Sequence, residues 1–147
     1  MFDEPNRLAS LVAAQDQAAA LFAAAQGAGL LRAGVSESQL SQEIHDLAAA
    51  QFGVTTHWHR KVVRAGANTV ATFYESPPET VLGEDDLVFV DLGPVFGTWE
   101  ADYGRTFVLG CDPEKLRLAA DLDAVWEALA ALWRGRPDIT GAELYAA

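Results

Sequence analysis

The chain has 147 residues, half of them hydrophobic, with a formal net charge of −11 and one cysteine. Its length suits one globular domain with a core of its own. The acidic excess excludes nucleic acids and anionic membranes as expected partners, because both attract basic patches, and a lone cysteine excludes an internal disulfide. With neither a secretory signal pattern nor a long uninterrupted apolar stretch, we expect a cytoplasmic protein with no membrane partner.

Two helices are predicted first. Residues 4–33 are rich in Ala, Leu and Gln, which favour helix formation. We expect one long helix there, loosened at two internal glycines and ended by Gly34. Ser36 is a suitable N-cap for a second helix, with Gln39 at the position that completes a capping box. This second helix should stop near Gly53.

Strands are predicted in the middle of the chain, at residues 55–64 and, more briefly, at 68–74. His57 and His59 are two positions apart in the first of these, so both side chains should face the same way. The pair suits a metal site or contact with a substrate. The alternative is a half-exposed strand with both imidazoles in water, and the lack of acidic residues nearby in the sequence favours it.

A hairpin with two aspartates follows. Residues 87–92 are apolar at both alternating positions except at Asp91, which indicates a strand covered on both faces. Residues 99–109 return as its partner. With the turn centred directly after Phe96, Asp91 lies opposite Asp102, and opposed side chains have Cβ atoms about 4.5–5.5 Å apart.

Two carboxylates at this separation repel, and burying either one uncompensated is costly. A shared proton would relieve the repulsion, and so would a divalent cation bound by oxygen atoms from two adjacent strands. Arg105 could neutralise one carboxylate, but in this register its side chain points to the opposite face. The alternative is an error in the register that leaves Asp102 exposed in a loop.

A third helix is predicted after the hairpin, opened by Asp112 and Pro113 and ended near Gly135. One side of it should be buried, because apolar residues recur there at helical spacing. That side consists of Leu116, Leu118, Leu122, Val125, Leu129 and Leu132.

A short internal similarity relates residues 35–40 to residues 139–144. Each segment has a β-branched residue, a hydroxyl N-cap, Gln or Glu three positions later, and then Leu. One interpretation is that a second helix–helix–sheet unit starts near residue 137. The other is that capping boxes are common and that so short a similarity has no meaning.

Residues 86–110 resemble the pita-bread metallopeptidases, which include methionine aminopeptidase, aminopeptidase P, prolidase and creatinase. The order of predicted elements is also that of the family's N-terminal half, so the resemblance covers nearly the whole chain. The matching residues are Asp91, Gly93, Gly97, Trp99, Asp102, Arg105-Thr106-Phe107 and Leu109-Gly110.

The resemblance implies an α+β fold, the first half of a pita-bread fold, with a curved antiparallel sheet covered by helices. Residues 1–147 would then be the N-terminal portion of a single catalytic domain, whose second half begins near residue 137 and is truncated. Because the family's fold consists of two pseudo-symmetric halves, the resemblance favours the repeat interpretation.

The resemblance also implies a metal-dependent, peptidase-like hydrolase with two divalent metal ions, commonly Mn, Co, Zn or Fe. Asp91 would bind one ion and Asp102 would bridge both, and the ions would activate a water molecule for attack on a carbonyl group. The sequence at 102–107 is most similar to aminopeptidase P and prolidase. The expected substrate is therefore a peptide or small amide, with Xaa-Pro peptides favoured.

Three departures from the family's pattern affect these expectations. The remaining metal ligands, a His and two Glu, belong to the family's second half, so the chain alone is expected to be inactive. The family's substrate-contacting His is missing from residues 70–74, which makes His57 and His59 the candidates for that role. Gly104 stands where the family usually has Thr or Ser.

A different class of function stays open, namely a non-catalytic pita-bread module that binds peptides or proteins. The presence of both available ligands, Asp91 and Asp102, favours the enzyme. If these residues form the whole product, an uncovered strand edge should recruit a second chain, for instance as a homodimer.

Overall fold

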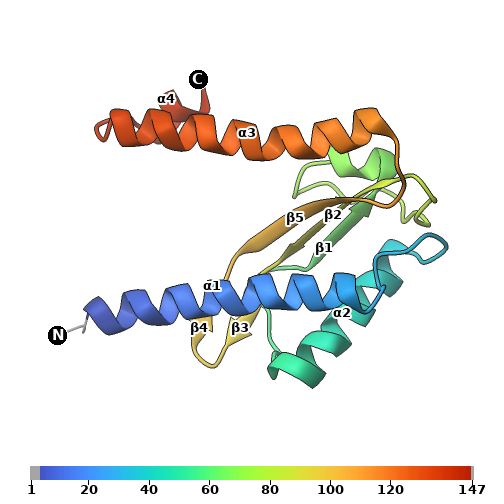
Figure 1. Ribbon diagram of the computed structural model, residues 1–147. Helices are drawn as coiled ribbons and strands as arrows, with labels where there is room; N and C mark the ends of the chain where they lie inside the picture. The colour runs from blue at the N-terminus through green and yellow to red at the C-terminus, as the bar shows by residue number, and fades with distance from the viewer. Residues whose placement is uncertain (1–3, 147) are drawn as a thin grey trace. The chain divides into compact units, whose positions relative to one another are not determined.

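The computed structural model describes residues 4–146, with side chains from residue 6 onward. It divides into two compact units, Met1–Gly110 and Cys111–Ala147, each described by itself. The mixture of helices with an antiparallel sheet confirms the expected α+β class (Figure 1). In chain order the elements are α1 (Glu4–Gly27), α2 (Glu37–Phe52), β1 (Val62–Ala65), η1 (Gly66–Val70), β2 (Leu87–Leu92), β3 (Val95–Phe96), β4 (Trp99–Glu100), β5 (Tyr103–Val108), α3 (Pro113–Gly135) and α4 (Gly141–Tyr145).

Helix α1 ends earlier than the predicted Gly34. Gly29 has a φ of +68°, and the Leu30 N–H donates to the Ala25 carbonyl at 3.1 Å, which is the pattern of a glycine-terminated helix. Glycine adopts this left-handed conformation without strain because it has no Cβ. The helix therefore ends at Gly27, closed by Gly29, rather than continuing to Gly34.

One side of α1 belongs to the hydrophobic core and packs against β3, β4 and β5. Asn6–Gly27 is also long and apolar enough to cross a membrane by length and composition alone, a test that core helices of globular proteins pass as well. Packing in the core accounts for the apolar composition of this side. Its buried residues are Ala14, Ala18, Leu21, Phe22 and Ala25.

Helix α2 begins and ends as predicted. The Ser36 Oγ accepts a hydrogen bond from the Gln39 N–H at 3.2 Å, and Gly53, with a φ of +67°, terminates the helix. The Gln39 side chain donates to Glu43 rather than reaching back, so only half of the capping box forms. The buried apolar residues of α2 are Leu40, Ile44 and Ala48.

The predicted strand at 55–64 is limited to β1, whose four residues are all buried. The predicted strand at 68–74 is wrong, because the chain turns into the 3₁₀ helix η1 there. Gly66 starts this turn with a φ of +53°, and the Thr69 hydroxyl donates to the Gly66 carbonyl at 2.8 Å. The side chain of Asn68 donates to buried Glu37 of α2, which holds the turn in place.

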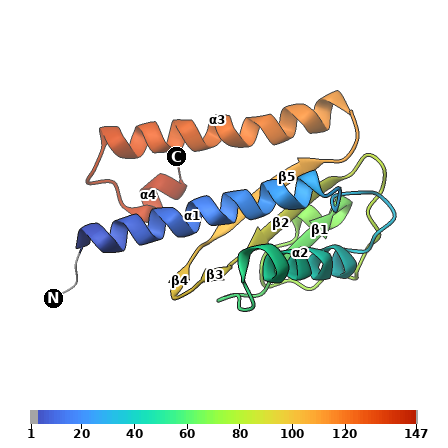
Figure 2. The same ribbon diagram turned by 60° about the horizontal axis from the view of Figure 1, so that its bottom comes forward.

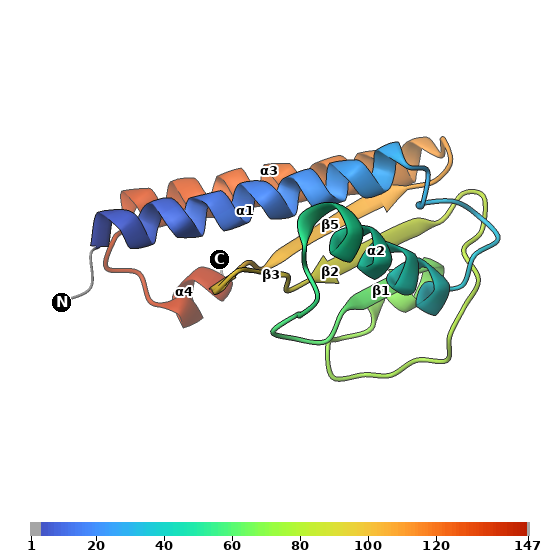
Figure 3. The same ribbon diagram turned by 90° about the horizontal axis from the view of Figure 1, so that it is seen from below.

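Strand β2 is central in a three-stranded sheet of order β1-β2-β5. Helices α1 and α2 lie on the same face of this sheet, as Figures 2 and 3 show. We expected cover on both faces of β2, but side chains alternate between faces and both helices cover the same one, so the other face is only partly buried. The buried residues are Val88, Val90 and Leu92, and the partly exposed ones are Leu87, Phe89 and Asp91.

Strands β3 and β4 form a tight hairpin in which Phe96 pairs with Trp99. Its loop consists of Gly97 and Thr98, and Gly97 has the positive φ, +65°, that such short loops require. The turn is therefore centred one residue later than predicted.

The second unit contains α3 and α4, and both predicted helix starts are confirmed. Asp112 accepts from the Glu114 N–H at 2.8 Å, and Thr140 and Glu143 form a complete capping box. The predicted buried side of α3 is not enclosed by this unit, in which no residue of α3 is buried. A unit with two helices of 23 and 5 residues is too small to enclose an apolar side.

Candidate metal centre

Asp91 lies on the central strand β2, where its backbone pairs with Val62 of β1 and Gly104 of β5. Because its neighbours Val90 and Leu92 are buried on the helix-covered face, Asp91 points to the other face. Its side chain is 24% exposed. Strands on both sides hold the backbone, so the sheet determines where this carboxylate lies.

Asp102 lies just before β5, and its predicted position directly opposite Asp91 is wrong by two residues, because Gly104 takes that place. The later turn centre is the cause. An even shift in register keeps every side chain on its face. Asp102 is therefore a diagonal neighbour of Asp91 on the same face. Its side chain is 67% exposed, so the alternative of an exposed loop position is partly correct.

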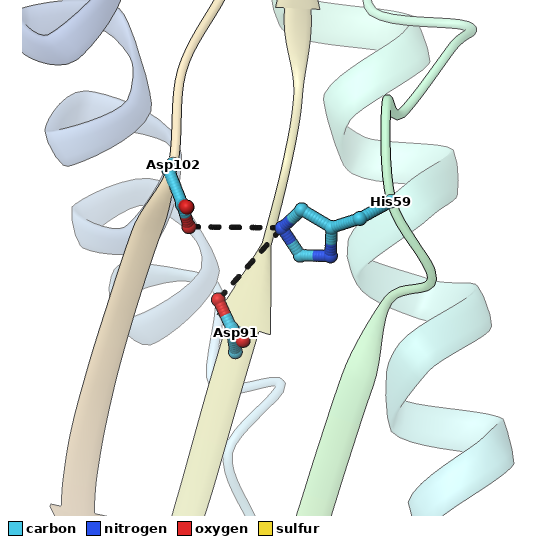
Figure 4. Close-up of side chains that lie close together, drawn as sticks. All are labelled: His59, Asp91 and Asp102. Atoms are coloured by element: carbon cyan, nitrogen blue, oxygen red, sulfur yellow. Dashed lines mark ion pairs between the residues drawn. The ribbon is translucent and has the colours of Figure 1, made fainter. Parts of the chain in front are cut away.

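His59 completes a cluster with the two carboxylates (Figure 4). Its Nε2 atom lies 3.9 Å from the Asp91 Oδ1 atom and 3.7 Å from the Asp102 Oδ1 atom. One potential ligand atom from each residue lies within 4.8 Å of the other two. The expectation of water-exposed histidines without an acidic partner is therefore wrong for His59, whose side chain is only 10% exposed.

Backbone hydrogen bonds hold the segment that carries His59 against the end of β2. The Trp58 N–H donates to the Gly93 carbonyl at 2.9 Å, and the Val95 N–H donates to the Thr56 carbonyl at 3.0 Å. These bonds cross between parts of the chain that are distant in sequence. They bring an imidazole to the aspartates.

Gly93 and Trp58 determine how closely His59 can approach. A Cβ atom on Gly93 would lie 2.4 Å from the His59 Cδ2 atom and 2.7 Å from the Trp58 Nε1 atom. Both distances are shorter than the 3.0 Å that real Cβ contacts respect. The Trp58 indole N–H donates to the Ala101 carbonyl at 2.9 Å, next to Asp102. The sequence interpretation assigned neither role, although the Asp-x-Gly spacing after the strand contained the signal for Gly93.

His57 lies outside the cluster. The segment around it is not a regular strand, so the expectation that His57 and His59 share a face is wrong. The His57 ring packs against His45 of α2, with ring centroids 5.8 Å apart, and both of its ring nitrogens are buried without a hydrogen-bond partner among residues 6–146. The pKa of His57 is lowered to about 4, mainly by burial and to a smaller extent by the positive charge of Lys61.

Acid should destabilise the fold through His57. An unfolded histidine titrates near its ordinary pKa of about 6.5, whereas folded His57 resists protonation down to about 4. Neutral His57 therefore makes its full contribution to the free energy of unfolding above the unfolded pKa. This contribution is lost as the pH falls from the unfolded pKa to the folded pKa. His57→Phe keeps a ring that cannot be protonated, so its melting temperature should depend less on pH between 7 and about 4. A melting temperature that falls with pH as steeply in His57→Phe as in the wild type would contradict this prediction.

The donor set of the cluster fits a divalent metal ion. Carboxylate oxygen and imidazole nitrogen are ligand types shared by Mn, Fe, Co and Zn sites. The His59 Nδ1 atom lies 2.7 Å from the Arg60 carbonyl oxygen. A carbonyl only accepts, so Nδ1 carries the proton of this contact, and Nε2 is the ring nitrogen that faces the carboxylates and is available to a metal ion.

Residues 9–147 match the model of metallopeptidase family M24. The chain belongs to this family. The resemblance to the pita-bread metallopeptidases that the motif around Asp91 and Asp102 indicated is thereby confirmed for nearly the whole chain. No curated protein matches the M24 chain.

Among solved structures, a prolidase from Thermococcus sibiricus has a similar fold, with a TM-score of 0.65 and 21% identity. The match covers 82% of the M24 chain and 33% of the prolidase, so this chain spans about a third of that protein's length. At this identity the likeness shows the fold, which is part of a pita-bread fold.

The electrostatics of the cluster formed by His59, Asp91 and Asp102 favour a cation. Burial raises the pKa of the Asp91 carboxyl group, and the Asp102 charge adds to this rise, while His59 acts in the opposite direction. The fold therefore disfavours the charged form of Asp91. A positive ion among these three side chains would stabilise that form.

Proposed function

We propose that this M24 chain carries the first half of a dinuclear metal centre in a peptidase-like hydrolase of the aminopeptidase P or Xaa-Pro dipeptidase type. One observation carries the proposal: Asp91, Asp102 and His59 come from separate parts of the chain, yet their ligand atoms lie within 4.8 Å of one another. Family membership supports the class of reaction.

The two carboxylates suit different tasks. Asp91 comes from a central strand and is mostly buried, so it can anchor one ion in a fixed position. Asp102 is 67% exposed, so it has room to bridge to a second ion. Divalent ions of the Mn, Co, Zn or Fe type lower the pKa of a water molecule and polarise a carbonyl group. Of the two candidate histidines, only His59 reaches this site.

A small peptide with an Xaa-Pro bond is the proposed substrate. The sequence at 102–107 and the fold likeness to a prolidase support this choice. Two half-exposed aromatic rings also lie beside His59, with centroid distances of 4.5 Å to Trp58 and 6.3 Å to Phe73. Such rings suit contact with the apolar ring of proline.

The remaining ligands are proposed to come from a second, related half that begins near residue 137. The 33% coverage of the prolidase and the similarity between residues 35–40 and 139–144 support this division. The chain by itself should then bind metal without turning over substrate. A second copy that pairs through an uncovered strand edge, forming a homodimer, is another way to complete the sheet.

Calorimetric titration of Mn²⁺ into the metal-free chain tests the proposal. We expect binding by the wild type and none by the double variant Asp91→Asn/Asp102→Asn. Asp123→Asn removes an exposed acid from α3 and should bind like the wild type. Hydrolysis of an Xaa-Pro dipeptide, measured in parallel, should be absent with the chain alone.

Two results would contradict parts of the proposal. A wild-type chain that binds none of Mn²⁺, Co²⁺ and Zn²⁺ would remove the metal centre and favour the non-catalytic binding module. Metal-dependent hydrolysis by the chain alone would show that the ligands of a second half are not needed.

A further inference from the structure

The His59 side chain contains a polar atom whose position needs an explanation. Its Nε2 atom is buried and has no hydrogen-bond partner within the part of the chain that the structure describes. Leaving such an atom without a partner is unfavourable for the fold. The side chain is nevertheless 10% exposed and aimed at two carboxylates (Figure 4).

A proton on Nε2 does not account for this geometry. The distances to the two carboxylate oxygens are 3.7 and 3.9 Å, and N–H···O hydrogen bonds measure about 2.7–3.2 Å. A metal ion accounts for it better, because two ligands at about 2.1 Å from one ion are separated by about 3.4 Å in a tetrahedral set. The separations of 3.7 and 3.9 Å between Nε2 and the two carboxylate oxygens exceed that value by about half an ångström or less, and all three ligand atoms lie within 4.8 Å of one another.

Contact with substrate explains the geometry less well. The Nε2 atom is buried, so it does not face the solvent from which a substrate arrives. The Trp58 ring packs edge-on against the imidazole, and so does the Phe73 ring. His59 would have to move before it could donate to or accept from a peptide.

The geometry points to His59 as the third protein ligand of the ion held by Asp91 and Asp102, so that this half of the fold forms a His–Asp–Asp metal site by itself. The inference rests on the proposed metal centre and replaces the substrate-contacting role of His59 with ligation. Arg60 supplies the supporting contact, because its carbonyl oxygen accepts the Nδ1 proton and leaves Nε2 available to the metal.

Cobalt binding to the intact chain tests this inference. Co²⁺ is titrated into wild-type protein, His59→Ala and the matched control His57→Ala, with affinity read from calorimetry and visible absorption. We expect His59→Ala to weaken binding by at least roughly 10- to 100-fold, since even the loss of a contact that orients a ligand costs that much. His57→Ala should stay within about twofold of the wild type, because His57 lies outside the cluster.

Proton NMR of the wild-type Co²⁺ complex provides a measurement that does not depend on whether His59→Ala folds. An imidazole that binds through Nε2 keeps its Nδ1 proton, which then gives a strongly shifted resonance that disappears in deuterated water. The resonance should be present in the wild type and in His57→Ala. Its presence in His57→Ala excludes metal binding by the other two of the chain's three histidines, His45 and His57.

The outcomes separate this inference from the proposed function. Wild-type binding of Co²⁺ without a shifted imidazole proton, and with unchanged affinity in His59→Ala, would overturn the ligand role and leave the two aspartates as the metal site. A shifted proton that is lost in His57→Ala would also overturn it. A wild-type chain that binds none of Co²⁺, Mn²⁺ and Zn²⁺ would overturn both the inference and the metal centre.

Discussion

Replacing Gly93 by alanine should destabilise the fold and weaken metal binding together. The new Cβ atom would lie 2.4 Å from the His59 Cδ2 atom, 2.8 Å from its Nε2 atom and 2.7 Å from the Trp58 Nε1 atom. Both rings must move. Strain of this kind costs roughly 1–3 kcal/mol, and loss of the hydrogen bond from Trp58 to Ala101 adds about 1 kcal/mol.

Urea denaturation and Co²⁺ titration measure the two effects of Gly93→Ala. We expect a lower unfolding midpoint and a loss of Co²⁺ affinity similar to that of His59→Ala. Gly27→Ala is the matched control, because an added Cβ there meets no atom within 4 Å. The control should be neutral or stabilising by up to about 1 kcal/mol, as alanine favours helix over glycine. If both variants behave alike, Gly93 does not determine the approach of His59.

Replacing Asp91 by asparagine should have opposite effects on stability without and with metal. Burial raises the pKa of the Asp91 carboxyl group, so its charge at neutral pH is unfavourable in the metal-free fold. The asparagine side chain carries no charge, so the metal-free Asp91→Asn variant should melt at a higher temperature than the wild type. With Co²⁺ at 100 times its dissociation constant, the wild type should gain about 2.7 kcal/mol and the variant should gain little.

The difference in stability between the metal-free Asp91→Asn variant and the wild type should depend on pH, and the direction of this dependence provides a second test. A carboxyl group with a raised folded pKa binds more protons in the folded state, so its contribution to stability falls as pH rises from its unfolded pKa through its folded pKa. The advantage of metal-free Asp91→Asn should therefore grow from about pH 4 to pH 7. Asp123→Asn controls for the change in net charge. An Asp91→Asn variant that is less stable than the wild type at neutral pH without metal would contradict the burial argument.

In all of these predictions the proposed metal site is unfavourable to the fold while no ion is bound. A partly buried carboxylate, an unpartnered imidazole nitrogen and a backbone position restricted to glycine all lie within one cluster among the described residues. Each of them is expected to reduce the stability of the metal-free protein. Binding of a cation to all three side chains would offset these costs.

Helix boundaries and the central strand could be predicted from the sequence because their causes are local. Ser36 and Gly53 bound α2, and Thr140 with Glu143 starts α4. Each of these residues acts on backbone groups within a turn of itself. The apolar run of β2 was equally readable. Gly29 shows the limit of such reasoning, because several glycines could close α1 and only the structure identifies the one that does.

The sequence by itself determined that two aspartates lie on one face of an antiparallel hairpin, since side chains alternate along strands and an error of two residues in register leaves the face unchanged. Only the tertiary structure decided that Asp91 pairs with Gly104 and that His59 joins the two acids. The physical reason is that the cluster depends on hydrogen bonds between distant segments, such as that from Trp58 to Gly93, and on the space left by a missing Cβ. Neither leaves a periodic pattern in the chain.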